Sequence, residues 1–505
     1  MSRRQRRPRR QEPAVTQLPP RKVVNPYKPI EVLTEDQIET IHLASLRVLE
    51  EIGMEVLSER ALDLLDAAGA DVDRDTNRVR FDRGLVLDAV DKAPATFTMY
   101  ARDPAHNLTM GGGHINFSVV GSAPNSSDID RGRRAGNFDD FRDLLRLGHG
   151  LNIVHLFAGY PVEPVDLPAE TRHLDCNLAF ITLTDRVWHV YSLGGGRVSD
   201  GLEMVAMARG VDRDQLLREP SIMTVVNTNS PLRIDGPMGD GLIEMAENGQ
   251  AVVVTPFTLS GAMSPATIAG SLTQQNAEAL AGIALIQIAN PGAPAMYGGF
   301  TSNVDMKSGA PAFGTPEYTR AALGGGQLAR RYGVPYRSSN ANAANLVDAQ
   351  AAYESEMSIW GAVMGHANLM KHGLGWLEGG LTASFEKVII DAEMLQMMAE
   401  FLEPLEITEA AIGIEAMKEV GPGGHFFGCA HTLERYETAF YPPMVSDWRN
   451  FETWQETGAQ SATQRANAIW KAMLADYEEP PLDPAVKEAL EAYAARRKQE
   501  IAASD

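Results

Sequence analysis

Six short apolar runs in the middle of the chain each end in a cluster of small polar residues, and a helix-like stretch follows most of them. Strand-then-helix alternation at roughly 30–45 residues per unit is typical of a parallel α/β fold. We therefore expect an α/β protein built on a (β/α)8 TIM-type barrel, with an N-terminal helical and β extension and a C-terminal helical segment. The runs are residues 187–192, 222–226, 251–255, 295–297, 334–336 and 374–377.

The chain length of 505 residues fits such a barrel with smaller units at both ends. Residues 1–29 hold six arginines in the first ten positions and are predicted to form a disordered basic arm, either a solvated tail or a contact for an acidic partner. The extension then covers residues 30–136 and the barrel residues 137–420. A loop-rich and helical segment, residues 421–505, is expected to close the barrel.

Composition narrows the class of protein and the kind of partner. The formal net charge of −21 argues against nucleic acid as a partner. No apolar run reaches the roughly 18–20 residues of a membrane span, and no apolar segment of a signal peptide follows the N-terminal arginines. The chain has only two cysteines, far apart in sequence, which fits a reducing compartment, so we expect a cytoplasmic enzyme.

The polar clusters should meet at one site, because the strands of such a barrel all end at the same face. Arg337 could pair with a substrate carboxylate in a bidentate fork, and Glu378 is the lone carboxylate of the clusters. Aromatic faces beside a carboxylate suit a quaternary ammonium, which has no N–H to donate. Core packing is the alternative role for each aromatic residue. The aromatic candidates are Tyr297, Phe300, Tyr336, Trp376 and, on the following helix, Tyr353.

Common catalytic motifs are missing from these strand ends. The sequence has no GxSxG elbow, no HExxH pair and no dinucleotide-binding glycine fingerprint after a first strand. His425, Cys429 and His431 could suggest a metal triplet, but they fall in a glycine-rich turn segment, and we expect no metal.

Three blocks of sequence carry a family resemblance: residues 334–354, residues 375–391 and residues 421–432. In that order they resemble the trimethylamine methyltransferase family of corrinoid-dependent enzymes, and the resemblance covers nearly the whole chain. It implies a barrel enzyme that moves a methyl group from an amine to the cobalt of a separate corrinoid protein. It also implies that the corrinoid is carried by that partner, with no cofactor tightly bound by this chain.

One departure from the family narrows the substrate. In the trimethylamine enzymes a pyrrolysine stands in the loop that matches roughly residues 338–345 here, whereas this chain has only standard residues there. This points to the non-pyrrolysine branch, some members of which demethylate quaternary amines such as glycine betaine. Arg337, or Asn and Ser donors such as Asn340 and Asn229, would then hold the substrate carboxylate. The aromatic candidates would hold the ammonium, Glu378 would balance its charge, and His372 would lie behind them.

Two other functions fit the same sequence. One is a corrinoid-independent barrel lyase with Glu378 as the base, and the other is a non-catalytic protein that binds or senses quaternary amines. Glycine betaine, proline betaine, carnitine, choline and other methylamines all stay open as substrates. A homo-oligomer is expected.

Overall fold

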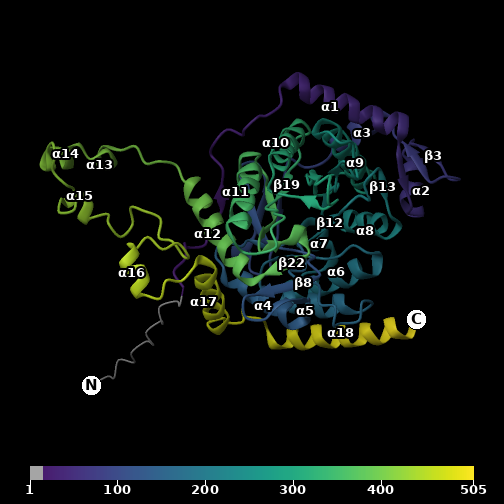
Figure 1. Cartoon of the computed structure of the whole chain (residues 1–505). Helices are drawn as coiled ribbons and strands as arrows, with labels where there is room; N and C mark the ends of the chain where they lie inside the picture. The colour runs from purple at the N-terminus through teal and green to yellow at the C-terminus, as the bar shows by residue number, and fades with distance from the viewer. Residues whose placement is uncertain (1–14, 505) are drawn as a thin grey trace.

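The computed structural model describes residues 15–504. Its centre is a closed barrel of eight parallel strands, because the first strand, β7, also pairs with the last, β20 (Figure 1). The prediction of a (β/α)8 barrel is thereby confirmed. The strands, in barrel order, are β7 (His114–Val119), β10 (Leu156–Phe157), β11 (Val187–His189), β12 (Ile222–Val226), β14 (Ala251–Val254), β16 (Ala295–Gly298), β19 (Tyr336–Ser339) and β20 (Leu369–Leu374).

One main helix follows each strand and covers the outside of the barrel. Several helices begin where the sequence offers a capping side chain: Thr315 accepts a hydrogen bond from the N–H of Tyr318, and Pro316 occupies the first helical position of α10. The helices are α4 (Phe138–Gly150), α5 (Arg172–Leu183), α6 (Gly195–Arg209), α8 (Gly236–Glu247), α9 (Ile268–Ala289), α10 (Pro316–Arg331), α11 (Ala349–Met364) and α12 (Phe385–Phe401), with a short α7 (Arg213–Arg218) after α6.

The barrel begins earlier in the chain than we expected. Its first strand, β7, precedes residue 137, and the strand expected at residues 153–158 is the second one, β10. The polar residues His114, Asn116 and Ser118 alternate with apolar ones in β7, so this strand lacks the continuous apolar run of the others. The last strand, β20, likewise lies earlier than the expected run at residues 374–377, and this brings Lys371 into the barrel wall.

The amino end of the barrel is closed by a hairpin of β5 (Thr96–Met99) and β6 (Leu108–Gly111). Met99 and Met110 of this hairpin pack in one apolar cluster with Leu156, Val187 and Leu369 from the barrel strands. A ligand therefore has to enter from the carboxyl ends of the strands. The 3-10 turn η2 (Pro104–His106) connects the two strands of this hairpin. A separate four-stranded sheet follows the carboxyl ends of β7 and β20 and consists of β8 (Asn125–Asp128), β9 (Gly132–Ala135), β21 (Trp376–Leu377) and β22 (Thr382–Ser384), with the 3-10 turn η3 (Glu378–Gly380) between β21 and β22.

The N-terminal extension wraps the outside of the barrel. Residues 15–29, expected to be disordered, follow its surface: Val23 is buried, and β1 (Val23–Val24) pairs with β7. Residues 1–14 of the expected basic arm lie outside the described residues. The other elements here are α1 (Glu35–Arg47), the π-turn η1 (Val48–Ile52), β2 (Met54–Val56), α2 (Glu59–Ala67), β3 (Asp71–Asp73), β4 (Arg78–Arg80) and α3 (Arg83–Val90), with β13 (Arg233–Ile234) completing their sheet.

The C-terminal segment lies outside the barrel. Helix α17 (Ala462–Ala475) packs against α12 and α4, and α18 (Pro484–Ser504) lies along α5 and α6 (Figure 1). Between α12 and α17 the chain makes an excursion away from the barrel, with the short helices α13 (Glu409–Ile412), α14 (Ile414–Val420), α15 (Ala430–Leu433) and α16 (Phe451–Glu456). A small sheet of β15 (Leu259–Ser260), β17 (Ser302–Val304) and β18 (Pro311–Ala312) follows β14 and β16. No helix among residues 15–504 combines the length and apolarity that a bilayer crossing requires.

Candidate active site

The inner face of the barrel changes from apolar to polar along the strands. Side chains alternate between the two faces of a strand, so a residue two positions after an inward-facing one also faces inward. Leu369 and Val187 belong to the apolar cluster at the closed end. Lys371 and His189, two positions further on, therefore face the interior nearer the open end. Arg337 is the register partner of Leu369 and shares its face.

Arg337 is a buried cation with few partners. One guanidinium nitrogen, Nη2, donates to Ser339 Oγ at 2.7 Å, and the guanidinium carbon lies 5.0 Å from the ring centroid of Phe300. Nε and Nη1 have no hydrogen-bond partner among the described residues. Burial lowers the pKa of Arg337 to about 10, so the guanidinium is still charged at neutral pH.

Lys371 brings a second positive charge to the same interior. Its side chain is buried, and the pKa is lowered to about 7, first by burial and then by the charge of Arg337. Neither cation forms an ion pair with a carboxylate among the described residues. The barrel interior therefore holds two cations without a directly paired anion, and Glu163 acts on Lys371 only from a distance and raises its pKa.

A cavity of about 400 Å³ opens beside Lys371 at the ends of β7, β10, β11 and β12. The rings of Tyr160 and Tyr191 lie in its wall with their centroids 4.4 Å apart. Tyr191 donates its hydroxyl hydrogen to Glu163 Oε1 at 2.5 Å, and burial raises the pKa of Glu163. The Tyr160 hydroxyl is buried and has the Cys176 thiol beside it. This end of the cavity offers aromatic faces and one carboxylate.

A second aromatic group, outside the residues that line this cavity, lies on the side of β16 and β20. Trp376 lies 4.3 Å from His372 and 5.9 Å from Phe300, measured between ring centroids. The Trp376 ring is held by a hydrogen bond from Nε1 to the carbonyl of Asn342 at 3.0 Å. His372 accepts from the N–H of Gly121 at 3.0 Å, and burial holds its pKa well below the usual range, so the ring is neutral.

Among the predicted site residues, the structure brings Arg337, Phe300, Trp376 and His372 together. Asn340 is also buried nearby: its amide donates to the carbonyl of Gly373 at 2.9 Å, and its Oδ1 has no partner among the described residues.

The other candidates lie elsewhere. Tyr336 and Tyr297 face the helices, with their hydroxyls bonded to Ala322 of α10 and to Asn276 of α9. Strand alternation explains this placement, because an inward Arg337 turns its neighbour Tyr336 outward. Glu378 is already paired with Arg133 at 2.9 Å.

Two more candidates lie on outer surfaces. Tyr353 is 60% exposed on the outer side of α11. Asn229 is exposed, and its Oδ1 accepts a hydrogen bond from the N–H of Asp235 at 3.0 Å. Side-chain-to-backbone hydrogen bonds of this kind are typical of asparagines in turns.

Sequence reasoning missed five residues of the site. Lys371 and His189 are polar residues next to apolar ones in their strands. This pattern is the sequence signal that could have identified them as site residues. Tyr191 lies within the apolar run at residues 187–192, whereas only the polar residues after that run were considered as site candidates. The missed residues are Tyr160, Glu163, His189, Tyr191 and Lys371.

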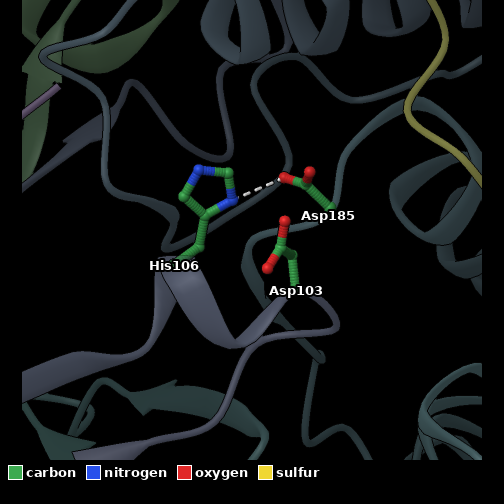
Figure 2. Close-up of side chains that lie close together, drawn as sticks. All are labelled: Asp103, His106 and Asp185. Atoms are coloured by element: carbon green, nitrogen blue, oxygen red, sulfur yellow. Dashed lines mark hydrogen bonds and ion pairs between the residues drawn. The ribbon is translucent and has the colours of Figure 1, made fainter. Parts of the chain in front are cut away.

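Asp103, His106 and Asp185 form a separate cluster at the closed end of the barrel, with side chains pointing toward one another (Figure 2). His106 Nδ1 lies 2.8 Å from Asp185 Oδ1. Arg186 and His149 also act on Asp185, and together with His106 they hold its pKa below the usual range. With the Arg186 cation beside Asp185, we interpret the cluster as a charged hydrogen-bond network on the face opposite the site.

The sequence of the chain matches a known protein family. The family model described as trimethylamine methyltransferase (MTTB) matches residues 1–502. A glycine betaine methyltransferase of Desulfitobacterium hafniense (strain Y51) is 36% identical over 471 residues, which cover 93% of this chain and 98% of the relative. The trimethylamine methyltransferase MttB of D. hafniense (strain DSM 10664 / DCB-2) is 28% identical over 451 residues, 89% of this chain and 90% of the relative.

Among solved structures, the monomethylamine methyltransferase MtmB of Methanosarcina barkeri aligns over 90% of both chains with 11% identity and a TM-score of 0.49. The match to the family model and the 36% identical relative each span nearly the whole chain. The protein is therefore a methyltransferase and belongs to the trimethylamine methyltransferase family.

Proposed function

We propose that the enzyme takes a methyl group from a quaternary amine that carries a carboxylate, such as glycine betaine, and transfers it to a separate corrinoid protein. The observation that carries this proposal is the pair of buried cations, Arg337 and Lys371, neither of which forms an ion pair with a carboxylate among the described residues. Burial of an unpaired charge costs several kcal/mol. A substrate carboxylate offsets that cost, whereas trimethylamine has no carboxylate and would leave both charges unpaired.

The free hydrogen-bond donors of Arg337 suit this role. Nε and Nη1 are the two unpartnered nitrogens, and a carboxylate oxygen can accept from each. The ring of Phe300 lies against the guanidinium and restricts its position. Lys371 adds a mobile second donor from the neighbouring strand.

The ammonium end of a betaine would then meet aromatic faces. Trp376 lies on one side, and Tyr160 and Tyr191 lie on the cavity side near Lys371. Each face contributes about 0.5–2 kcal/mol to binding when it is desolvated. Glu163, at the same end, balances the positive charge. This role was expected for Glu378, but Glu378 does not line the cavity, and its ion pair with Arg133 at 2.9 Å is closer than the 3.8 Å contact of Glu163 with Arg172.

The proposed reaction requires little acid or base catalysis from these residues. A quaternary amine leaves as a neutral tertiary amine once its methyl group is removed, so no proton has to be delivered. When docked, the corrinoid of the partner protein supplies a Co(I) nucleophile that accepts the methyl group. The side chains of this chain bind the donor, orient one methyl toward the open end and exclude water.

Two further observations support the betaine. The 36% identical relative is a glycine betaine methyltransferase, and residues 338–345 contain only standard amino acids. Both cysteines are free and buried, in keeping with a reducing, cytoplasmic setting. A homo-oligomer is expected as well, and the large apolar side chains exposed in residues 405–440, between α12 and α17, support it.

The test is methylation of a Co(I) corrinoid protein, followed by its absorbance, with glycine betaine, proline betaine, carnitine, choline and trimethylamine in parallel. We expect methyl-Co(III) with a carboxylate-bearing quaternary amine and none with trimethylamine. Betaine binding without methylation of any corrinoid protein would instead favour a sensor. Conversion with trimethylamine alone would contradict the proposal.

A further inference from the structure

An arm of residues 405–440 stands away from the barrel and carries little core of its own (Figure 1). Every hydrogen bond found for these residues joins two residues of the arm, and none reaches another described part of the chain. Ala416 and Cys429 are its buried residues. Units below about 40 residues rarely fold without a metal, a disulfide or a partner surface. The arm therefore needs a surface to cover it.

The arm exposes large apolar side chains that water does not favour. Leu405, Phe427 and Phe440 are 84%, 85% and 83% exposed. Its helices α13, α14 and α15 also leave an open cavity of about 660 Å³ that no arm side chain fills. Further large apolar residues exposed on the arm are Ile407, Ile412, Ile414, Met417, Phe426, Leu433 and Tyr436.

A complementary surface lies on the barrel of the same chain, at the root of the arm. We define the apolar face as Tyr353, Met357 and Trp360 of α11 with Met397 and Phe401 of α12, all of them exposed. The α11 residues follow the spacing of one helix stripe. The rings of Trp360 and Phe401 lie 5.1 Å apart, so the two helices present one continuous face.

We propose that the arm of one copy packs on the apolar face of a second copy, and that the second copy's arm does the same in return. A second copy is favoured because both apolar surfaces belong to this chain and adjoin each other at residues 401–405. A two-fold association then covers each arm and each face at once, which is the arrangement of a closed symmetric dimer. A different protein that covered the arm alone would leave the apolar face of α11 and α12 exposed.

The area is sufficient for a stable interface. An aromatic side chain buries roughly 150–250 Å² when it is covered. Phe426, Phe427 and Phe440, with the surface that they cover and counted in both copies, would bury roughly 1,800 Å², within the range of about 1,200–2,000 Å² for specific interfaces. Large exposed apolar patches of this kind are typical of interaction surfaces.

The experiment measures the mass of the full-length protein in solution by light scattering at micromolar concentration. The arm variant is Phe427→Glu with Phe440→Glu, and the face variant is Tyr353→Glu with Met357→Glu. All four side chains are exposed, so each monomer should fold, which circular dichroism and the melting temperature check. Met306→Glu, 75% exposed outside both surfaces, is the matched control.

We expect the wild type and the control to be dimers or larger assemblies and each double variant to be a monomer. An equimolar mixture of the two variants should again form a dimer, because the intact arm of one meets the intact face of the other. A monomeric wild type, an arm variant that keeps the wild-type mass, or a mixture that stays monomeric would each overturn the proposal. The assay contains neither substrate nor corrinoid protein, so its result is independent of the proposed reaction.

Discussion

The guanidinium carbon of Arg337, buried in the barrel, lies over the ring of Phe300, 5.0 Å from the ring centroid. This contact and the bond to Ser339 Oγ fix the cation, while Nε and Nη1 have no partner among the described residues. A buried cation that is fixed in position but has no ion pair does not stabilise the fold. It is suited to bind an anionic ligand.

Replacement of Arg337 by methionine should not destabilise the ligand-free protein, because it removes a buried charge that lacks an ion pair. Arg186 is the matched control: it is also buried with its pKa lowered to about 10, but it donates to the carbonyls of Gly148, Leu151 and His149. Arg186→Met removes the donor to the carbonyls of Gly148 and His149, at about 1–3 kcal/mol each, and should lower the melting temperature clearly. Equal losses in the two variants would show that Arg337 is structural.

The affinity for glycine betaine should fall as the pH rises above about 7. The pKa of Lys371 is lowered to about 7 in the free enzyme, so the amine is protonated below that pH and neutral above it. A bound carboxylate favours the protonated form, so binding takes up a proton above pH 7, and Kd should rise by up to about tenfold per pH unit.

Calorimetry between pH 6 and 9, in buffers of different ionisation heat, measures both the affinity and the proton uptake. Lys371→Met should bind more weakly and lose the slope, whereas Lys371→Arg should keep the affinity and stay flat across this range. A wild-type Kd that does not change between pH 6 and 9 would exclude Lys371 from the carboxylate site.

Trp376 should contribute to binding through the positive charge of the substrate. The neutral isostere 3,3-dimethylbutanoate has the shape and carboxylate of glycine betaine but no cation. Trp376→Leu should raise Kd for glycine betaine about 2- to 30-fold, which corresponds to 0.5–2 kcal/mol, and change Kd for the isostere less. Trp376→Phe, which keeps an aromatic face, is the control. An equal loss for both ligands would mean that Trp376 acts only by packing.

A buried ion pair supports the strand-end loop from behind. Lys387 and Asp391 pair with each other, Lys387 Nζ also donates to Ser355 Oγ at 2.7 Å, and Asp391 accepts from the N–H of Gly375 at 2.8 Å. Asp391→Asn leaves a buried ammonium unpaired and should cost about 3–5 kcal/mol. The double variant Lys387→Met with Asp391→Leu should melt at a higher temperature than Asp391→Asn. The opposite order would contradict the view that the unpaired charge is the cause.

The barrel could be predicted from the sequence because its signal is local. Apolar runs such as residues 222–226 and 251–255 became barrel strands almost as expected. The strand β7 could not be found in this way: its sequence alternates, and its partner β20 lies about 250 residues further along the chain, so only the closed barrel identifies it.

The site was predictable in part for the same reason. Arg337 was found because a lone arginine at a strand end is conspicuous, and Trp376 and Phe300 because they follow strands. Tyr336 and Tyr297 also lie in predicted strands, so the sequence does not distinguish them from the aromatic residues of the site. The face of the strand that a residue occupies depends on the strand register, which cannot be read from the sequence alone. Lys371 was missed because a lysine inside an apolar strand is interpreted as a boundary until the barrel closes around it.

The most direct test of the carboxylate site compares the binding of glycine betaine and choline by calorimetry at pH 6.5. Both carry the trimethylammonium group, but choline has a hydroxyl where the betaine has its carboxylate. We predict that glycine betaine binds at least about 100-fold more tightly, a difference of about 2.7 kcal/mol, and that Arg337→Met removes most of this preference. Equal affinities for choline and glycine betaine in the wild type would contradict the assignment of Arg337 and Lys371 as the site of the substrate carboxylate.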